Sequence, residues 1–153
     1  MSTFSHSEEK NQTLLVRLQS ITYEAKDVSL FEFMPLHGQK LKAFSAGSHI
    51  DIHLPNGLIR QYSLCNSPLE TERYVVGVKK DPLSRGGSNF MHDKLKVGSE
   101  LKISLPRNLF PLANESSHAV LIGGGIGITP LISMAHELTA KNASWQLFAS
   151  FRS

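Results

Sequence analysis

A glycine-rich turn is the feature of this sequence that most directly suggests ligand chemistry. Gly123-Gly-Gly-Ile-Gly-Ile-Thr-Pro130 follows an apolar run and precedes a helical pattern. Glycines let a ligand approach the main chain closely, and the free N–H groups at a helix start suit a pyrophosphate. The usual GxGxxG fingerprint fails here, because its last position falls on Ile128 or Pro130, and no P-loop lysine is present. Taken alone, the turn fits a nucleotide site and a simple packing turn equally well.

Three other stretches combine charged, aromatic, hydroxyl and glycine residues. They are Arg60-Gln-Tyr-Ser63, Arg85-Gly-Gly-Ser88 and Leu105-Pro-Arg-Asn-Leu-Phe-Pro111. A guanidinium matches phosphate oxygens, and a tyrosine ring can lie against a flat ligand. The first two stretches also have interpretations without a ligand: Arg60 as an exposed strand charge, Tyr62 as a core residue and Gly86-Gly87 as an ordinary loop.

Metal and thiol chemistry are disfavoured by the sequence. A single cysteine, Cys65, excludes an internal disulfide, a cysteine-rich zinc site and an iron–sulfur cluster held by this chain alone. His49 and His53 lie in a strand-like stretch, which would hold them roughly 13 Å apart. We therefore expect no metal site, and we interpret Cys65 as a small buried hydrophobic residue.

Length and composition limit the architecture. The chain has 153 residues, 41% of them hydrophobic, enough for one barrel or sandwich domain and part of a second. A net charge of +3 favours anionic small molecules but is too weak to argue for nucleic acid. The N-terminus lacks the apolar core of a signal peptide. The apolar stretch Ala119–Ala135 contains four glycines and Pro130, which argues against a membrane span. We expect a cytoplasmic protein without a membrane association.

The first two thirds of the sequence predict a barrel of short strands. These are Leu14–Ile21, Val28–Met34, His49–Leu54, Ile59–Cys65, Tyr74–Lys80 and Glu100–Leu105. Few helical patterns intervene, which favours a closed antiparallel barrel. Asn56-Gly57 predicts a type I′ hairpin turn, since both residues tolerate a positive φ. A short helix over Ser88–Leu95, capped by Ser88, is expected to plug one end.

The pattern changes after Leu112. A polar linker over Ala113–Ser117 precedes the apolar strand His118–Ile122, which we expect to be buried on both faces. Thr129 can cap the next helix, and Pro130 suits its first turn. The apolar stripe of that helix is Leu131, Met134, Ala135 and Leu138, and Lys141-Asn142 ends it. With the strand Trp145–Phe151, this makes one βαβ unit. The predicted organisation is a flexible N-terminus (1–12), a barrel (13–112) and a partial α/β domain (113–153).

Taken in their order along the chain, the four motifs resemble those of the reductase components of aromatic-ring oxygenases and O-demethylases. The resemblance covers about Leu14 to Ser153 and is to the phthalate dioxygenase reductase and vanillate demethylase reductase group of the ferredoxin–NADP reductase superfamily. It implies a six-stranded antiparallel Greek-key flavin-binding barrel with one short helix. The first βαβ unit of a nucleotide-binding domain would follow. Full-length relatives also carry a [2Fe-2S] domain, so the chain resembles a truncated member.

The resemblance assigns roles to individual residues. Arg60 would pair with the flavin phosphate, and Tyr62 would lie against the isoalloxazine. Ser63, near flavin N5, and Thr129, on the nicotinamide side, are the candidate catalytic residues. The backbone amides of Val78 and Lys79 would meet the pyrimidine edge. The full set of implied cofactor-binding residues is Arg60, Gln61, Tyr62, Ser63, Val78, Lys79, Lys80, Arg85, Gly86, Gly87, Ser88, Gly124, Gly125, Ile126, Gly127, Ile128 and Thr129.

The implied activity is that of a flavin-dependent electron-transfer reductase. NAD(P)H would give hydride to FMN, which is favoured over FAD, and single electrons would pass to an iron–sulfur ferredoxin domain or oxygenase component. The choice between NADH and NADPH stays open. Arg152 is at a position where relatives often contact the adenosine ribose or its phosphate, but it is the one residue of that pocket in this sequence. Two alternatives remain: an NAD(P)H:flavin reductase and an FMN-binding fragment without turnover. A barrel that binds single-stranded nucleic acid is disfavoured, because the aromatic residues alternate with strand period and belong to the core.

Overall fold

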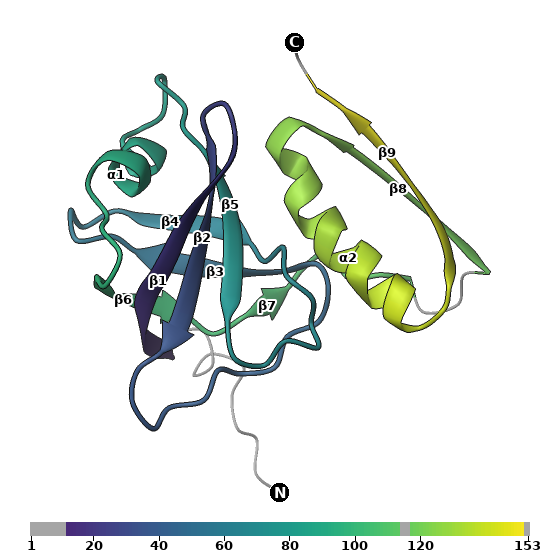
Figure 1. Cartoon of the computed structure of the whole chain (residues 1–153), viewed down its shortest axis with the longest axis horizontal. Helices are drawn as coiled ribbons and strands as arrows, with labels where there is room; N and C mark the ends of the chain where they lie inside the picture. The colour runs from purple at the N-terminus through teal and green to yellow at the C-terminus, as the bar shows by residue number, and fades with distance from the viewer. Residues whose placement is uncertain (1–11, 114–116, 152–153) are drawn as a thin grey trace, which may run out of the picture.

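The computed structural model describes residues 12–113 and 117–151 and contains two separate sheets (Figure 1). Most of the expected flexible N-terminus, the middle of the expected linker and Arg152 lie outside the described residues. The larger sheet contains β1 (Thr13–Ala25), β2 (Val28–Pro35), β3 (Ser48–His53), β4 (Ile59–Ser63), β5 (Tyr74–Lys79) and β6 (Glu100–Ser104), with a short β7 (Arg107–Asn108) paired to β3.

The larger sheet runs in the order β4-β3-β6-β1-β2-β5, and every pairing in it is antiparallel. The predicted six-stranded antiparallel barrel is therefore confirmed. Its closure is only partial, because β4 and β5, the first and last strands, meet at one isolated bridge between Leu64 and Val76. Beyond that bridge, the edge of β5 that faces β4 has no strand partner among the described residues.

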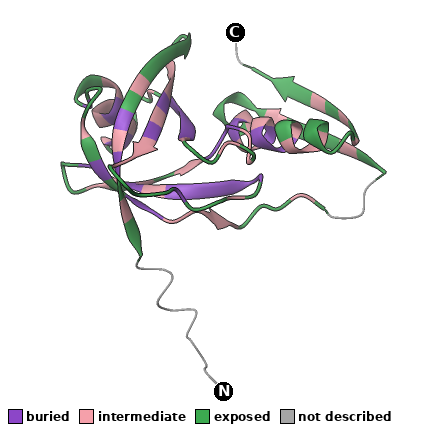
Figure 2. Ribbon diagram, turned by 60° about the horizontal axis from the view of Figure 1, so that its bottom comes forward, coloured by how far each residue is buried: buried purple, intermediate pink, exposed green. Residues whose placement is uncertain are grey.

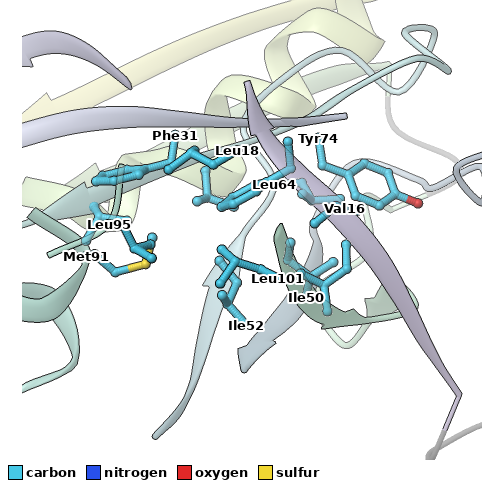
Figure 3. Packing of buried hydrophobic residues seen from close by; sticks show 14 of the residues in the cluster. Val16, Leu18, Phe31, Ile50, Ile52, Leu64, Tyr74, Met91, Leu95 and Leu101 are labelled. Carbon is cyan, nitrogen blue, oxygen red and sulfur yellow. The ribbon is translucent and has the colours of Figure 1, made fainter. Parts of the chain in front are cut away.

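Side chains that alternate along the strands fill the barrel (Figure 3). Pairs such as Val16 and Leu18 on β1, or Phe31 and Phe33 on β2, are fully buried, as the period of two in a strand requires. The short helix α1 (Gly87–Asp93) contributes Met91 to this core, and Leu95 follows it. The helix therefore closes one end of the barrel, as predicted.

Two details of the loops differ from the sequence prediction. In the β3–β4 turn only Gly57 has a positive φ (86°), and its N–H donates to the Leu54 carbonyl at 2.9 Å. The turn is thus not type I′: Pro55, with its fixed φ, is its second residue. Ser88 does not cap α1 either. Gly86 is the cap, and the Ser88 hydroxyl accepts the Asp81 backbone N–H at 3.1 Å.

The second sheet confirms the predicted βαβ unit. β8 (His118–Gly124) and β9 (Ser144–Ser150) are parallel and are joined by a 3-10 turn, η2 (Gly125–Ile128), and α2 (Thr129–Ala140). Thr129 is the first residue of α2 and not its cap, and its hydroxyl donates to the Ile126 carbonyl. Leu131 and Met134 are buried, with Ala135 and Leu138 packed beside them.

The expectation that the first strand of this unit is buried on both faces is wrong. Only Leu121 of β8 is buried, and Ile122 is 75% exposed. Helix α2 covers one face of β8 and β9, and exposed residues dominate the rest of this sheet (Figures 1 and 2). In the described part of the chain, no helix is long and apolar enough to cross a membrane.

Gly47, in the loop before β3, carries a specific fold constraint. Its φ is +96°, and an added Cβ would overlap the backbone carbonyl of Phe110. We predict that Gly47→Ala lowers the free energy of unfolding by about 2–5 kcal/mol, from left-handed strain plus overpacking. Gly38→Ala is the matched control, since Gly38 also has a positive φ (+73°) but open space around it. Urea unfolding measures both, and equal losses would contradict the overlap.

Candidate functional site

Strand β4 presents its motif on two faces. In the β3–β4 ladder, Arg60 and Tyr62 pair with Ile52 and Ile50, whereas Ser63 pairs with His49. Arg60 and Tyr62 therefore share one face, and Ser63 shares the other with Gln61. Tyr62 packs against the barrel core, and burial raises the pKa of its phenol while Arg60 opposes the rise. The structure thus brings Arg60 and Tyr62 together on one face of β4 and places the Ser63 side chain on the other face, at the end of the strand.

Arg60 and the Arg85–Ser88 loop form a cationic cradle. The Arg60 Nη2 donates to the Arg85 carbonyl at 3.1 Å. Its side chain crosses directly over Gly87, where an added Cβ would lie 2.6 Å from both Cγ and Nε of Arg60. Gly86 adopts φ 85°, which L residues rarely tolerate. A guanidinium above a side-chain-free stretch of backbone is the donor set that a phosphate group requires.

The remaining cationic candidates occupy different environments. The Lys80 ammonium pairs with Asp93 of α1 at 2.6 Å, so its charge is directed to the helix. Lys79 and Arg85 are exposed. Gln61 is also exposed, and its Nε2 donates to Asp51 on the neighbouring strand at 3.4 Å. Of the predicted basic residues, Arg60 is the one whose side chain the structure places directly over a loop glycine, Gly87.

The open edge of β5 offers main-chain groups to a ligand. The side chain of Val78 is buried in the core, which leaves only its backbone available. Lys80 N–H donates to the Asp27 carbonyl on the β2 side, and antiparallel strands bond at alternate residues. Val78 therefore also directs its polar backbone groups to β2, whereas Gly77 and Lys79 direct theirs toward β4. The Val75 carbonyl confirms this alternation by accepting the Cys65 N–H at 2.9 Å.

Gly77, which is not among the predicted site residues, brings the glycine-rich turn to the barrel. A Cβ at Gly77 would lie 2.8 Å from Cγ2 of Thr129 and 3.8 Å from Cδ1 of Ile126. Thr129 is 9% exposed, but Gly124 to Gly127 are open to solvent at the start of α2. An isolated glycine inside a strand marks a close approach, which is the sequence feature that predicts this contact.

A cleft of about 390 Å³ lies between the outer face of β1, β2 and β5 and the helix α2. Arg73 bridges Glu70 and Glu32 in its wall at 2.6 Å each. Cys65 lies at its base, and burial raises the pKa of this thiol to about 11. Cys65 is therefore a neutral buried residue at physiological pH, in agreement with the sequence interpretation. Among the described residues, no group of three His, Cys, Asp or Glu side chains could hold a metal ion.

His49 is a buried titratable group next to the β4 motif. It is 7% exposed, and its Nε2 has no hydrogen-bond partner in the described part of the chain. Burial lowers the pKa of His49, and the charge of Arg107 lowers it further against the opposing effect of Asp51. The imidazole is therefore neutral at physiological pH. The position of Asn56-Gly57 midway between His49 and Ser63 is the sequence feature that would have predicted their pairing.

Comparisons with known proteins identify relatives of the chain. It is 52% identical over 130 residues to a vanillate O-demethylase oxidoreductase of Pseudomonas putida, a match that covers 85% of this chain and 41% of that protein. It is 46% identical over 138 residues to the phenoxybenzoate dioxygenase subunit beta of Ectopseudomonas oleovorans, covering 90% and 43%. No family model matches the sequence.

Among solved structures, phthalate dioxygenase reductase superposes with a TM-score of 0.90 at 39% identity, over 95% of this chain and 46% of that one. That protein is described as a modular structure for electron transfer from pyridine nucleotides to [2Fe-2S]. The chain thus spans less than half the length of these relatives.

The burial of neutral His49 predicts a pH dependence of stability. Its pKa is lower in the folded chain than the ordinary value of 6.5, so the unfolded chain binds the proton more readily. Stability should therefore fall as the pH drops below about 6.5, and His49→Gln should reduce this fall. Urea unfolding at a series of pH values from 7.5 to ~5 measures the slope. An identical slope in the variant would refute this role.

Proposed function

We propose that this chain, a relative of phthalate dioxygenase reductase and of the vanillate O-demethylase oxidoreductases, binds FMN and accepts hydride from NAD(P)H. The electrons would then pass singly to an iron–sulfur acceptor, either a ferredoxin domain or an oxygenase component. The observation that carries this proposal is the Arg60 guanidinium lying across Gly87 in the Arg85–Ser88 loop. Names of the relatives, which include oxidoreductases and oxygenase subunits, support the same class of activity.

The cradle favours a flavin with one terminal phosphate. Arg60 would neutralise the phosphate, and the backbone of Gly86 and Gly87 would admit its oxygens because no Cβ intervenes. The Ser88 hydroxyl accepts a backbone N–H and keeps its own proton, which it can donate. FMN places its only phosphate at the end of the ribityl chain, so a single cradle satisfies it.

The flavin ring would lie along the neighbouring edges of β4 and β5, which meet only at the Leu64–Val76 bridge. Tyr62 would lie against the isoalloxazine, and the main chain at Ser63 would approach N5. On the other side, the backbone groups of Lys79, which lie beyond the Leu64–Val76 bridge, would meet the donors and acceptors of the pyrimidine edge. The register supports Lys79 over Val78 for this contact. Bound flavin supplies the redox chemistry, while these residues bind and orient it.

The nucleotide would approach from the second unit. The exposed main chain of Gly124–Gly127 and the start of α2 offer N–H groups to a pyrophosphate. Thr129, held against Gly77, would lie where the nicotinamide meets the flavin. We accordingly propose residues 13–112 as the flavin-binding unit and 113–153 as part of the nucleotide-binding unit.

Removal of the Arg60 charge should discriminate between two flavins. We expect Arg60→Ala to weaken FMN binding by about 1.5–3 kcal/mol, the range for a charge-assisted contact, and to leave riboflavin binding nearly unchanged. Lys102→Ala, which removes an exposed charge from β6, is the control. Fluorescence titration gives both dissociation constants. Equal losses for FMN and riboflavin would remove Arg60 from the phosphate site.

Binding and turnover should separate in this chain. The FMN site lies within the barrel, so we expect stoichiometric FMN binding. The described parallel sheet has only β8 and β9, and Ile122 and Phe148 are 75% and 56% exposed. Parallel sheets normally have both faces covered, so we expect NADH to reduce the bound flavin slowly. Anaerobic stopped-flow reduction measures this rate. Rapid reduction at micromolar NADH would contradict the expectation, and absence of FMN binding would overturn the proposed function.

A further inference from the structure

Helix α2 touches the barrel near both of its ends. At its first residue, Thr129 is packed on Gly77 of β5, where an added Cβ would come within 2.8 Å of Cγ2. Two turns later, the Glu137 Oε2 accepts the backbone N–H of Ala46 at 3.0 Å. These contacts are eight residues apart, or about 12 Å along the helix axis. One contact alone would act as a pivot, whereas two fix the orientation of the helix.

The Glu137 carboxylate is held in place from both sides. Its Oε1 accepts from the Lys141 ammonium at 2.6 Å, one turn further along α2, while its Oε2 faces Ala46. The side chain is 20% exposed. Partial burial favours the neutral acid, but the bonds from Lys141 and Ala46 outweigh it and lower the pKa of Glu137. The group is therefore ionised at neutral pH, which strengthens its bond to the amide.

The barrel side of this contact is also rigid. The Asn108 amide Nδ2 donates to the Ala46 carbonyl at 2.9 Å and to the Ser45 hydroxyl at 2.7 Å. Ala46 itself is 1% exposed and packs with Leu131 and Met134 of α2. The backbone at Ala46, which Asn108 of β7 anchors, therefore enters the core of the second unit. The hydrogen bond from the Ala46 N–H to Glu137 accompanies this apolar packing.

We propose that Glu137 is a positioning residue that holds α2 on the barrel, so that the Gly125–Ile128 turn stays beside β5. Loss of its bond to Ala46 releases the far end of the helix and lets the near end move away from Gly77. The consequence for hydride transfer rests on the proposed function, because it assumes flavin on the barrel and nucleotide on the turn. The mechanical coupling between the two ends does not.

Nuclear magnetic resonance on the complete 153-residue chain tests the coupling without any cofactor. One readout is the exchange rate of the Ala46 amide, and the other is the NOE between the Thr129 methyl and the Gly77 Hα protons. We expect Glu137→Ala to accelerate Ala46 exchange roughly tenfold, as for the loss of one hydrogen bond to a charged group, and to abolish the NOE. Glu137→Gln retains an oxygen acceptor and should keep both readouts near those of the original chain.

Lys141→Met is the matched control. It removes the ion pair but leaves the Ala46 bond, so both readouts should persist. Faster Ala46 exchange with an unchanged Gly77–Thr129 NOE would overturn the proposal, since the bond would then act only locally. Unchanged Ala46 exchange would overturn it as well. Should Glu137→Ala fail to fold, Glu137→Asp withdraws the carboxylate by one methylene, and the same changes are expected from it.

An enzymatic measurement then separates this proposal from the proposed function. With FMN bound, Glu137→Ala should leave the FMN dissociation constant unchanged and slow reduction by NADH, and Glu137→Gln should restore the rate. Failure of the original chain to bind FMN would refute the proposed function, while the NMR outcome would still decide the role of Glu137. Weakened FMN binding in Glu137→Ala would count against a pure positioning role, because no cradle residue contacts α2.

Discussion

The open edge of β5 is the constraint on which the other features depend. β5 bonds to β2 along one edge, but its other edge meets β4 only through the Leu64–Val76 bridge. Beyond that bridge, among the described residues, the outward backbone groups of Lys79 have no strand partner and can bond to a ligand. A planar ligand with donors and acceptors along one side would satisfy this edge. Because Gly77 has no side chain, the same strand also contacts Thr129, so one element carries both the open edge and the contact with the glycine-rich turn.

The sequence predicted the elements well because their periodicities are clear. Six strands and both helices lie where alternation and helical spacing placed them, within a few residues. Two of the wrong predictions, the helix caps, concern local competition for hydrogen bonds. Ser88 and Thr129 are good caps by residue type, but the Ser88 hydroxyl is engaged with Asp81 and the Thr129 hydroxyl with Ile126. Cap preference describes a hydroxyl that is free to bond the first turn of its helix, whereas nearby backbone groups engage both of these hydroxyls.

The candidate site was only partly predictable, for a different reason. Residues such as Arg60 and Gly87 lie in short contiguous motifs, so the sequence itself shows them beside the residues with which they would act. Gly77 and His49 are important because of their contacts with other elements: Gly77 lies against Thr129, and His49 pairs with Ser63. The sequence alone does not show these contacts. The apolar residues of β8 led to a wrong prediction of burial on both faces. Such burial requires a covering layer on each face of the sheet. In the described structure α2 provides only one layer, so Ile122 remains exposed.

The distribution of contacts separates affinity from reactivity. Arg60 and the loop that contains Gly87 belong to the barrel, and no residue of α2 enters that cradle. The proposed hydride transfer, in contrast, would require the two rings to approach within van der Waals distance, and this would depend on the turn before α2. The barrel would then hold its ligand whatever the angle of α2, whereas the reaction rate would follow that angle. As we propose, Glu137 would affect only the second quantity, because its bond to Ala46 holds the far end of α2 and no part of the cradle.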